Sequence, residues 1–227
     1  MTLSSSHSRR YDAILRAAYH LFQASDFDDV TVRDLAREAG VGDATVYRYF
    51  ETKENLFATV YGDLLDTALE EIEAGDKQLE AEGPSEAAED WILRRILRVY
   101  NMRSSFYAKN PRNGARYLRS GFQRMGSSWT RNMAQGDRTI RLVERMLTEP
   151  VLARPLNART AELVAQNCHA VFMHEIERER ARDLSPDTIW DRLEPRLRVQ
   201  LEPALLGKVP LLTPCAVTES DSRLSRG

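Results

Sequence analysis

Residues 31–57 read TVRDLAREAGVGDATVYRYFETKENLF, and this stretch decides how the N-terminal part of the chain folds. Thr31 can cap a helix, and Asp34 three positions later can return a bond to it, as in a capping box. Gly40 stands where helices commonly end in a left-handed residue. A second short helix is predicted to follow, starting near Gly42. The stretch therefore predicts two short helices joined by a glycine-containing turn.

The second helix, predicted to run from Asp43 to Phe50, has an unusual outer face. Val46 and Phe50 are spaced to face inward. The outward positions hold side chains suited to phosphates and base edges: Asp43, Ala44, Thr45, Tyr47, Arg48 and Tyr49. A helix pair of this size can hold one helix in the major groove of DNA but cannot build a catalytic pocket. The alternative is a helical hairpin that only packs internally.

A further helix is predicted to begin directly after this pair. Thr52 can cap it, and Lys53 stands in its first turn. A cation at the N-terminal end opposes the helix dipole. The position of Lys53 therefore points to an external anion such as a DNA phosphate.

The pattern T-V-R-D-L-A-x-x-A-G-V-x-x-x-T-V-Y-x-Y-F-x-x-K-E-x-L-F resembles the DNA-binding domain of TetR-family transcriptional regulators over about residues 9–65. Gly42 departs from the family pattern, because relatives often carry serine or another stronger cap there. The resemblance implies phosphate contacts from Thr31, Thr45, Tyr47 and Lys53. Base-edge contacts are expected from Asp43, Ala44, Arg48 and Tyr49, with Arg48 able to pair with guanine and Asp43 with a cytosine amino group.

Helical periodicity without strand patterns predicts an all-α protein, with an N-terminal three-helix helix-turn-helix domain joined to a helical ligand-binding and dimerisation domain. The predicted divisions are a disordered arm (1–8), the DNA-binding domain (9–53), the effector-binding and dimerisation domain (54–207) and a disordered tail (208–227). A first helix is expected from Arg9 to Ser25, and a connecting helix from Lys53 to about Gly75.

Breaks are expected at four places farther along the chain. They are Gly83–Pro84, the segment AKNPRNG at 108–114, the stretch Pro150–Pro155, and Pro195, which should kink or split the last helix. A cap at Ser185 followed by Pro186 is expected to open that last helix.

Composition favours a globular cytoplasmic protein that is not an enzyme. The 227 residues are 42% hydrophobic and 29% charged, and no apolar run is long enough to span a membrane. The spacing of His169 and His174 does not suit a metal site, and neither a glycine-rich phosphate loop nor a nucleophile motif is present. No cofactor or metal is expected. Cys168 and Cys215 are expected to be free thiols.

The formal net charge of −2 is unexpected in a DNA-binding protein. Residues 1–57 contain seven Arg and Lys against nine Asp and Glu. Binding then depends on placement, with the cations Arg9, Arg10, Arg33, Arg48 and Lys53 on the DNA side and the acids Asp26, Asp28 and Asp29 elsewhere. The expected affinity is modest and strongly salt-dependent.

Charge is also segregated between neighbouring segments. Residues 58–90 contain eleven acids and one lysine, whereas residues 91–136 contain ten Arg and Lys and no acid. The first interpretation is attraction between adjacent solvated helices. The second is that some of the arginines line a pocket for an anionic effector: Arg94, Arg95, Arg98, Arg103, Arg116 and Arg119.

Aromatic and methionine residues gather in the middle of the chain, where the resemblance implies a ligand-binding bundle. Each of them alone is more often core. As a set, the candidate effector pocket comprises Trp91, Tyr100, Arg103, Tyr107, Phe122, Met125, Trp129, Met133, His169 and Phe172, with Asn132 and His174 as further polar groups. Aromatics beside arginines favour an apolar effector carrying an acid group.

Wide apolar stripes on the helices expected at about 158–182 and 186–206 suggest a homodimer through a four-helix bundle. Ala161, Ala165 and Ala170 would allow close approach, although packing within one chain also explains the stripes. The resulting hypothesis is a regulator, most simply a repressor, that binds a palindromic operator as a dimer and is released by a small molecule. The alternative is a helical small-molecule binding protein that does not use DNA.

Overall fold

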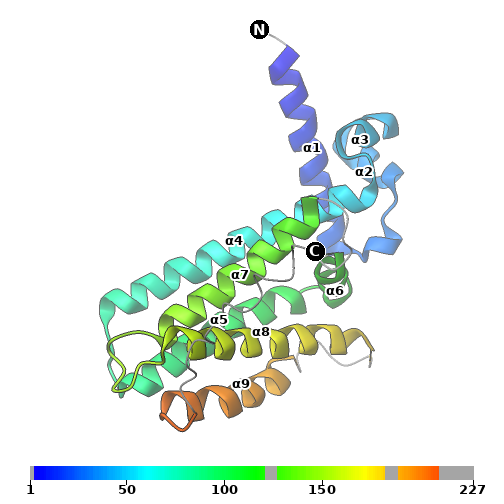
Figure 1. Cartoon of the computed structure of the whole chain (residues 1–227). Helices are drawn as coiled ribbons and strands as arrows, with labels where there is room; N and C mark the ends of the chain where they lie inside the picture. The colour runs from blue at the N-terminus through cyan, green and yellow to red at the C-terminus, as the bar shows by residue number, and fades with distance from the viewer. Residues whose placement is uncertain (1–2, 121–126, 182–188, 210–227) are drawn as a thin grey trace, which may run out of the picture.

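The computed structural model describes residues 3–120, 127–181 and 189–209. Within these ranges the chain is helical and contains no strand, which confirms the predicted all-α class. An N-terminal unit projects from one end of a layered helical body (Figure 1). The helices are α1 (Leu3–Ala24), the short 3-10 helix η1 (Phe27–Asp29), α2 (Val32–Ala39), α3 (Asp43–Phe50), α4 (Lys53–Glu82), α5 (Ala88–Ala108), α6 (Pro111–Ser120), α7 (Ser127–Leu147), α8 (Ala158–Ala181) and α9 (Ile189–Leu205).

The predicted helix pair is present with its predicted signals. The Thr31 side chain accepts from the Asp34 amide and the Asp34 carboxylate accepts from the Thr31 amide, so the capping box is complete. Gly40 ends α2 in the left-handed conformation with φ 65°. α3 starts after Gly42 and buries Val46 and Phe50. These local signals therefore fix both the turn and the inward face of α3.

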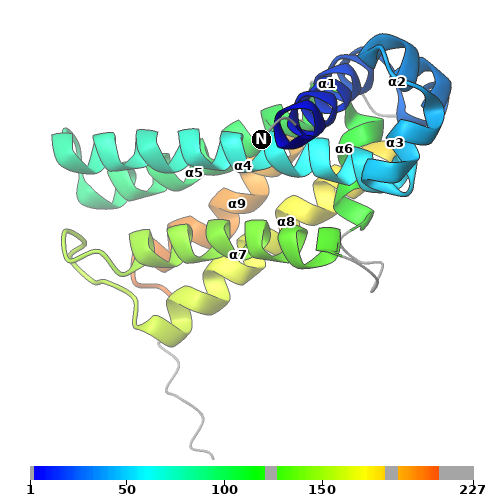
Figure 2. The same cartoon turned by 90° about the horizontal axis from the view of Figure 1, so that it is seen from above.

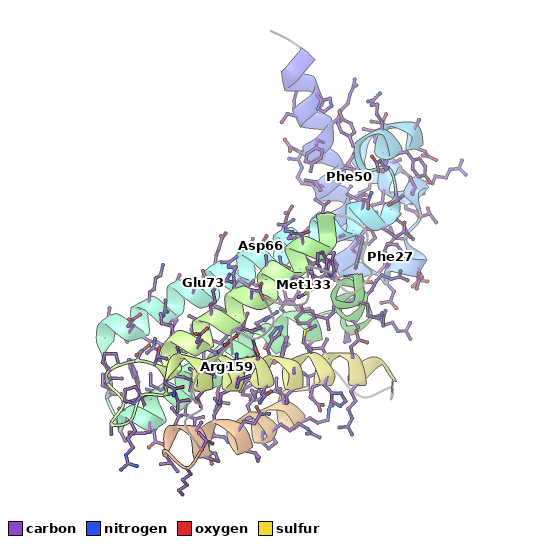
Figure 3. The ribbon with its side chains drawn as sticks, in the orientation of Figure 1. Phe27, Phe50, Asp66, Glu73, Met133 and Arg159 are labelled. Carbon is purple, nitrogen blue, oxygen red and sulfur yellow. The ribbon has the colours of Figure 1, made fainter. Side chains whose placement is uncertain are left out.

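The first helix is longer than the sequence predicts. α1 begins at Leu3, so most of the segment predicted as a disordered arm is helical in this structure. Phe50 packs between α1 and the end of α3 (Figure 3), with its ring stacked on Tyr11 at 5.1 Å between centroids. Ile14, Ala18 and Phe22 carry the buried stripe of α1.

The connecting helix α4 continues beyond the predicted end at Gly75 as far as Glu82. A glycine inside a helix costs only about 1 kcal/mol relative to alanine. The buried face of α4 continues through Leu69, Ile72 and Asp76. The Arg98 guanidinium lies over Gly75, where a Cβ would be 2.6 Å from one of its nitrogens. The predicted helix end at Gly75 is therefore wrong, because the packing of this face carries α4 past the glycine.

The segment predicted as a loop around residue 110 is a tight corner between two helices. α5 ends at Ala108 and α6 begins with Pro111, which occupies a first helical position that needs no N–H donor. The Asn110 side chain accepts from the Asn113 amide at 3.0 Å and caps α6. At this corner the sequence asparagine–proline, at positions 110 and 111, begins a helix.

The last helix is not split at Pro195, which lies inside a continuous α9. Interior proline costs about 3 kcal/mol. Leu193, Leu197 and Leu201 are fully buried on the inner face of α9, and each such burial contributes about 2 kcal/mol. Packing against α5 and α8 therefore outweighs the lost hydrogen bond.

The helical body forms layers: α8 and α9 lie below α4, α7 and α5 in Figure 1, and in the view from above α4 and α5 follow one side and α7 the other (Figure 2). No helix in the described ranges is long and apolar enough to cross a membrane. The predicted cap at 185–186 and almost all of the predicted tail lie outside the described residues.

Candidate functional site

The outer face of α3 is solvent-exposed at the end of the molecule that α2 and α3 form (Figure 1). Asp43, Ala44, Tyr47 and Arg48 are exposed, and half of the Tyr47 surface is accessible. Thr45 is half-buried. This face offers one cation, one anion, a phenolic hydroxyl and a methyl group over two turns, which are the groups that read phosphates and base edges.

The joint that follows α3 is strained and holds the helix at a fixed angle. Glu51 has φ 60° and ψ −47°, and the Thr52 amide donates to the Phe50 carbonyl. This geometry is a classic γ-turn, which is rare for a residue with a side chain. Thr52 then caps α4 by accepting from the Asn55 amide at 3.0 Å. The angle between α3 and α4 is therefore set by two adjacent residues.

Tyr49 is directed towards α1. Its hydroxyl donates to the His7 carbonyl at 3.1 Å, and its ring lies 4.6 Å from the His7 ring between centroids. The Arg48 guanidinium lies 5.4 Å from the centroid of the same ring. Tyr49, predicted as a base-edge contact, thus supports the N-terminal turns of α1 and orients Arg48 in this structure.

Thr31, Tyr47 and Lys53, three of the predicted phosphate anchors, line one surface hollow. The Lys53 ammonium is 2.8 Å from the Phe27 and Val30 carbonyls and 3.9 Å from the centre of the Phe27 ring. Burial lowers the Lys53 pKa, and the nearby carboxylates of Glu54 and Asp28 act against that shift.

These contacts give two of the predicted anchors structural roles as well. Two of the three ammonium protons of Lys53 are used internally, which leaves one for an outside acceptor. The Thr31 hydroxyl is engaged in the capping box. Arg33 is exposed in the first turn of α2.

Two acids of the N-terminal unit, Asp26 and Asp28, pair with the helical body. Asp26 pairs with Arg112 at 2.9 Å, and Asp28 pairs with Arg116 at 2.6 Å. Both arginines belong to α6. The negative charge that looked unsuitable for DNA binding is therefore partly neutralised by α6, although Asp28 also lines the hollow of Thr31, Tyr47 and Lys53.

A second set of contacts, which the sequence did not reveal, joins the N-terminal unit to α6. The Asn113 side chain accepts from the Phe27 amide at 2.7 Å and donates to the Phe22 and Ser25 carbonyls at 2.8 and 3.0 Å. Asn113 is 1% exposed. Phe27 lies close to the junction in Figure 3, and its ring centre is 4.0 Å from the Arg116 guanidinium. We call Asn113, Arg112 and Arg116 the α6 clasp.

Ion pairs between helices account for much of the charge segregation. On α4, Asp63 and Asp66 pair with Arg131, while Asp66 and Glu73 pair with Arg138; both arginines are on α7. Asp66 and Glu73 are labelled along α4 in Figure 3. For these residues the structure favours attraction between neighbouring helices over an anion pocket.

Arg95 shows the same behaviour in the interior. It is 1% exposed and lies 2.7 Å from Asp76 and 2.8 Å from Glu149. Arg145 also reaches Asp76 at 3.0 Å. The two charges of each sign largely neutralise one another, so this cluster is structural.

About half of the predicted effector set meets in one place. Arg103, Tyr100 and Tyr107 on α5 gather around Phe172 on α8, beside His169. Trp91 is buried beside Arg95, away from this group. Trp129 and Met133 are exposed on α7. Phe122 and Met125 lie outside the described residues.

Comparison with known proteins identifies the N-terminal unit. Residues 14–60 match the family model described as bacterial regulatory proteins of the tetR family. An uncharacterized HTH-type transcriptional regulator of Mycobacterium tuberculosis is 41% identical over 64 residues, which are 26% of this chain and 30% of that protein. The fatty acid metabolism regulator protein of Bacillus subtilis is 28% identical over 69 residues, 30% of this chain and 36% of that protein. The chain spans about a third of the length of these relatives.

Solved structures match nearly the whole chain. FadR of Thermus thermophilus, a TetR-family repressor in complex with lauroyl-CoA, has a TM-score of 0.60 at 18% identity, covering 90% of this chain and 97% of its own. FadR of Bacillus subtilis in complex with stearoyl-CoA has a TM-score of 0.56 at 19% identity, covering 87% and 98%. These likenesses show the fold. Residues 14–60 thus match the helix-turn-helix domain of the tetR family, and the rest of the described residues share the fold of the solved regulators.

Proposed function

We propose that this protein is a DNA-binding transcriptional regulator of the cytoplasm, which represses by occupying a palindromic operator and is released by a small-molecule effector. The observation that carries the proposal is the outer face of α3. Four exposed residues, with Tyr47 and Arg48 among them, stand on a helix whose inner face and both ends are fixed. A helix held rigidly with its recognition residues outward is what major-groove binding requires.

The roles of individual residues follow from their placement. Tyr47 and the third proton of Lys53 are the phosphate contacts, supported by Thr31 and Thr45. Arg48 and Asp43 read base edges, and Ala44 can contact a thymine methyl group. Arg33 adds an electrostatic contact from α2.

A dimer is needed because one exposed helix of this size reads only a half-site. The apolar stripes used to predict the dimer are buried within one chain, since Ala161, Ala165 and Leu197 are fully covered. The dimer surface is therefore the outer face of α8 and α9. Val199, which is 74% exposed, and the exposed Ala170 lie on that face.

Effector binding in the helical body can reach the DNA through two connections. α4 runs from the end of α3 into the body, where the Gln135 amide of α7 donates to the Gly62 carbonyl and to Asp66. The α6 clasp holds the other side of the N-terminal unit. A ligand that prefers one arrangement of α6 and α7 would shift the spacing of the two recognition helices. The acyl-CoA complexes of the two FadR neighbours make ligands with an acyl chain the first to test.

The test is a gel-shift titration with DNA from the intergenic region upstream of the protein's own gene. Wild-type protein should shift this DNA, and the shift should weaken steeply as salt rises. Tyr47→Phe removes only the exposed hydroxyl and should weaken binding to all sequences alike.

Tyr19→Phe is the matched control, because Tyr19 is also exposed but lies on α1 away from α3. It should bind like the wild type. If no shift appears at low salt, the regulator proposal is wrong and a binding protein that does not use DNA is the better description.

A further inference from the structure

Two arginines on α5 are almost fully buried, and they differ in one respect. Arg95 lies against two carboxylates. Arg103 is 2% exposed, yet no carboxylate of the described residues lies within ion-pair distance of it. Its Nη1 donates to the Thr139 hydroxyl at 2.7 Å, and its guanidinium lies 4.7 Å from the centre of the Phe172 ring. Arg103 Nε has no hydrogen-bond partner.

Other polar atoms without partners lie beside it. The Tyr100 hydroxyl and His169 Nδ1 are shielded from solvent and make no hydrogen bond. The Tyr107 hydroxyl is shielded as well, and Arg103 is the group beside it. The rings of all three residues lie within 6 Å of the Phe172 ring between centroids, at 5.7, 5.7 and 5.9 Å. We call Tyr100, Arg103, Tyr107 and His169 the Arg103 niche.

The three rings stay uncharged in this niche. Burial raises the pKa of both tyrosine hydroxyls, while the positive charge of Arg103 acts in the opposite direction. Burial, helped by Arg103, lowers the pKa of His169 to about 3. At neutral pH the niche therefore holds one positive charge and three neutral groups able to donate hydrogen bonds.

This arrangement is unfavourable without a partner. Burial of a charge without a counter-ion is costly, and each unpaired buried polar atom adds to that cost. The hydrogen bond that Arg103 donates to Thr139 and its cation–π contact with Phe172 do not offset that cost. An anion that accepted from Arg103 Nε and the two hydroxyls would satisfy the niche.

We propose that the Arg103 niche binds the carboxylate of an apolar monocarboxylic acid, and that this acid is the effector. The inference rests on the proposed function, because it specifies the ligand of the same helical body. A guanidinium binds a carboxylate through parallel hydrogen bonds, and one carboxylate neutralises one arginine. The aromatic rings around the niche suit an apolar body. The polyanionic head of a coenzyme A thioester does not match a niche with a single cation.

The charge is tested with Arg103→Met, which keeps the length of the side chain and removes its cation. Exchange of a buried unpaired charge for an apolar group is often neutral or stabilising, so this variant should fold and melt at or above the wild-type temperature. Arg103→Lys keeps the charge without the planar fork and provides a second folded variant. Arg94→Met is the matched control, because Arg94 stands on the same helix but pairs with Glu86 at the surface.

Binding is measured by isothermal titration calorimetry with decanoate, methyl decanoate and decanoyl-CoA, in the absence of DNA. Decanoate should bind the wild type and Arg94→Met equally. The affinity of decanoate for Arg103→Met should be at least about tenfold lower than for the wild type, and its affinity for Arg103→Lys should lie between these two values. Methyl decanoate should bind the wild type as weakly as decanoate binds Arg103→Met.

Three results would overturn the inference: no binding of decanoate to the wild type, equal binding to Arg103→Met, or binding of decanoyl-CoA in preference to decanoate. Because no DNA is present, these results are separate from a failure of operator binding.

Discussion

Replacement of Asn113 by alanine should loosen the N-terminal unit from the helical body. The side chain makes three hydrogen bonds to the end of α1 and to η1, at 2.7, 2.8 and 3.0 Å, and it is buried. Alanine fills the helix position on α6 without strain but leaves those backbone groups without this partner.

The size of the effect follows from what each group retains. The Phe27 amide loses its acceptor, which costs about 1 to 3 kcal/mol for a buried donor. The Phe22 carbonyl keeps a long contact with the Tyr61 hydroxyl at 3.5 Å, and the Ser25 carbonyl keeps one with Asn110 at 3.5 Å. Each carbonyl therefore loses less than the amide. The unfolding free energy of Asn113→Ala is therefore expected to fall by about 3 kcal/mol in total.

The assay is urea unfolding followed by far-ultraviolet circular dichroism, together with hydrogen exchange of peptides covering residues 14–30. All three tryptophans, at positions 91, 129 and 190, lie in the helical body, so their fluorescence reports that body alone. In Asn113→Ala, exchange should accelerate around Phe22–Val30, while the fluorescence transition moves less than the dichroism transition.

Arg112→Ala is the control from the same turn of α6. Arg112 pairs with Asp26 but three quarters of its side chain is exposed, so its loss should change the unfolding free energy by less than about 1 kcal/mol. Equal stability of Asn113→Ala and the wild type, or equal effects of the two variants, would refute the reasoning that buried hydrogen bonds hold the junction.

Three further outcomes are expected. Arg95→Met should lower the unfolding free energy by about 3 kcal/mol, because Asp76 stays buried with only Arg145; urea titration checks this, and a loss no larger than that of the surface variant Arg94→Met would contradict it. The pKa of His169 is depressed from 6.5 to about 3 in the folded protein, so unfolding takes up a proton below pH 6.5 and stability should fall as the pH drops from 6.5 towards 3. His169→Gln should make that fall shallower, and an unchanged slope would show that His169 does not carry it. Burial raises the pKa of the Cys168 thiol to about 12, so in a Cys215→Ser background it should react with Ellman's reagent at pH 8 only after unfolding.

The helix-turn-helix could be predicted because its signals are local. A capping box, a left-handed glycine and the spacing of Val46 and Phe50 each act within one or two turns, and the structure shows all of them. Local signals gave a wrong prediction where tertiary packing determines the length of a helix. Gly75 looked like a helix end, but the buried face of α4 continues past it to Asp76.

The sequence could not show which of the buried arginines in the helical body have a carboxylate partner. Arg95 and Arg103 stand in the same acid-free stretch, and the sequence gives no reason to separate them. Their difference depends on Asp76 of α4 and on Glu149, which follows α7; both lie against Arg95 and not against Arg103. The α6 clasp was missed for a similar reason, since Asn113 meets partners that are 86 to 91 residues away. Such contacts depend on tertiary structure and leave no local pattern.

The central claim is that the outer face of α3 reads DNA as a pair of half-sites. DNase I footprinting of the upstream intergenic DNA, with wild-type protein and with Arg48→Ala, tests it most directly. The account predicts a protected palindrome with half-sites about one helical turn apart or a multiple of it, and a weakened footprint with altered base preference in Arg48→Ala. Absence of protection at low salt, or an identical footprint from Arg48→Ala, would contradict it.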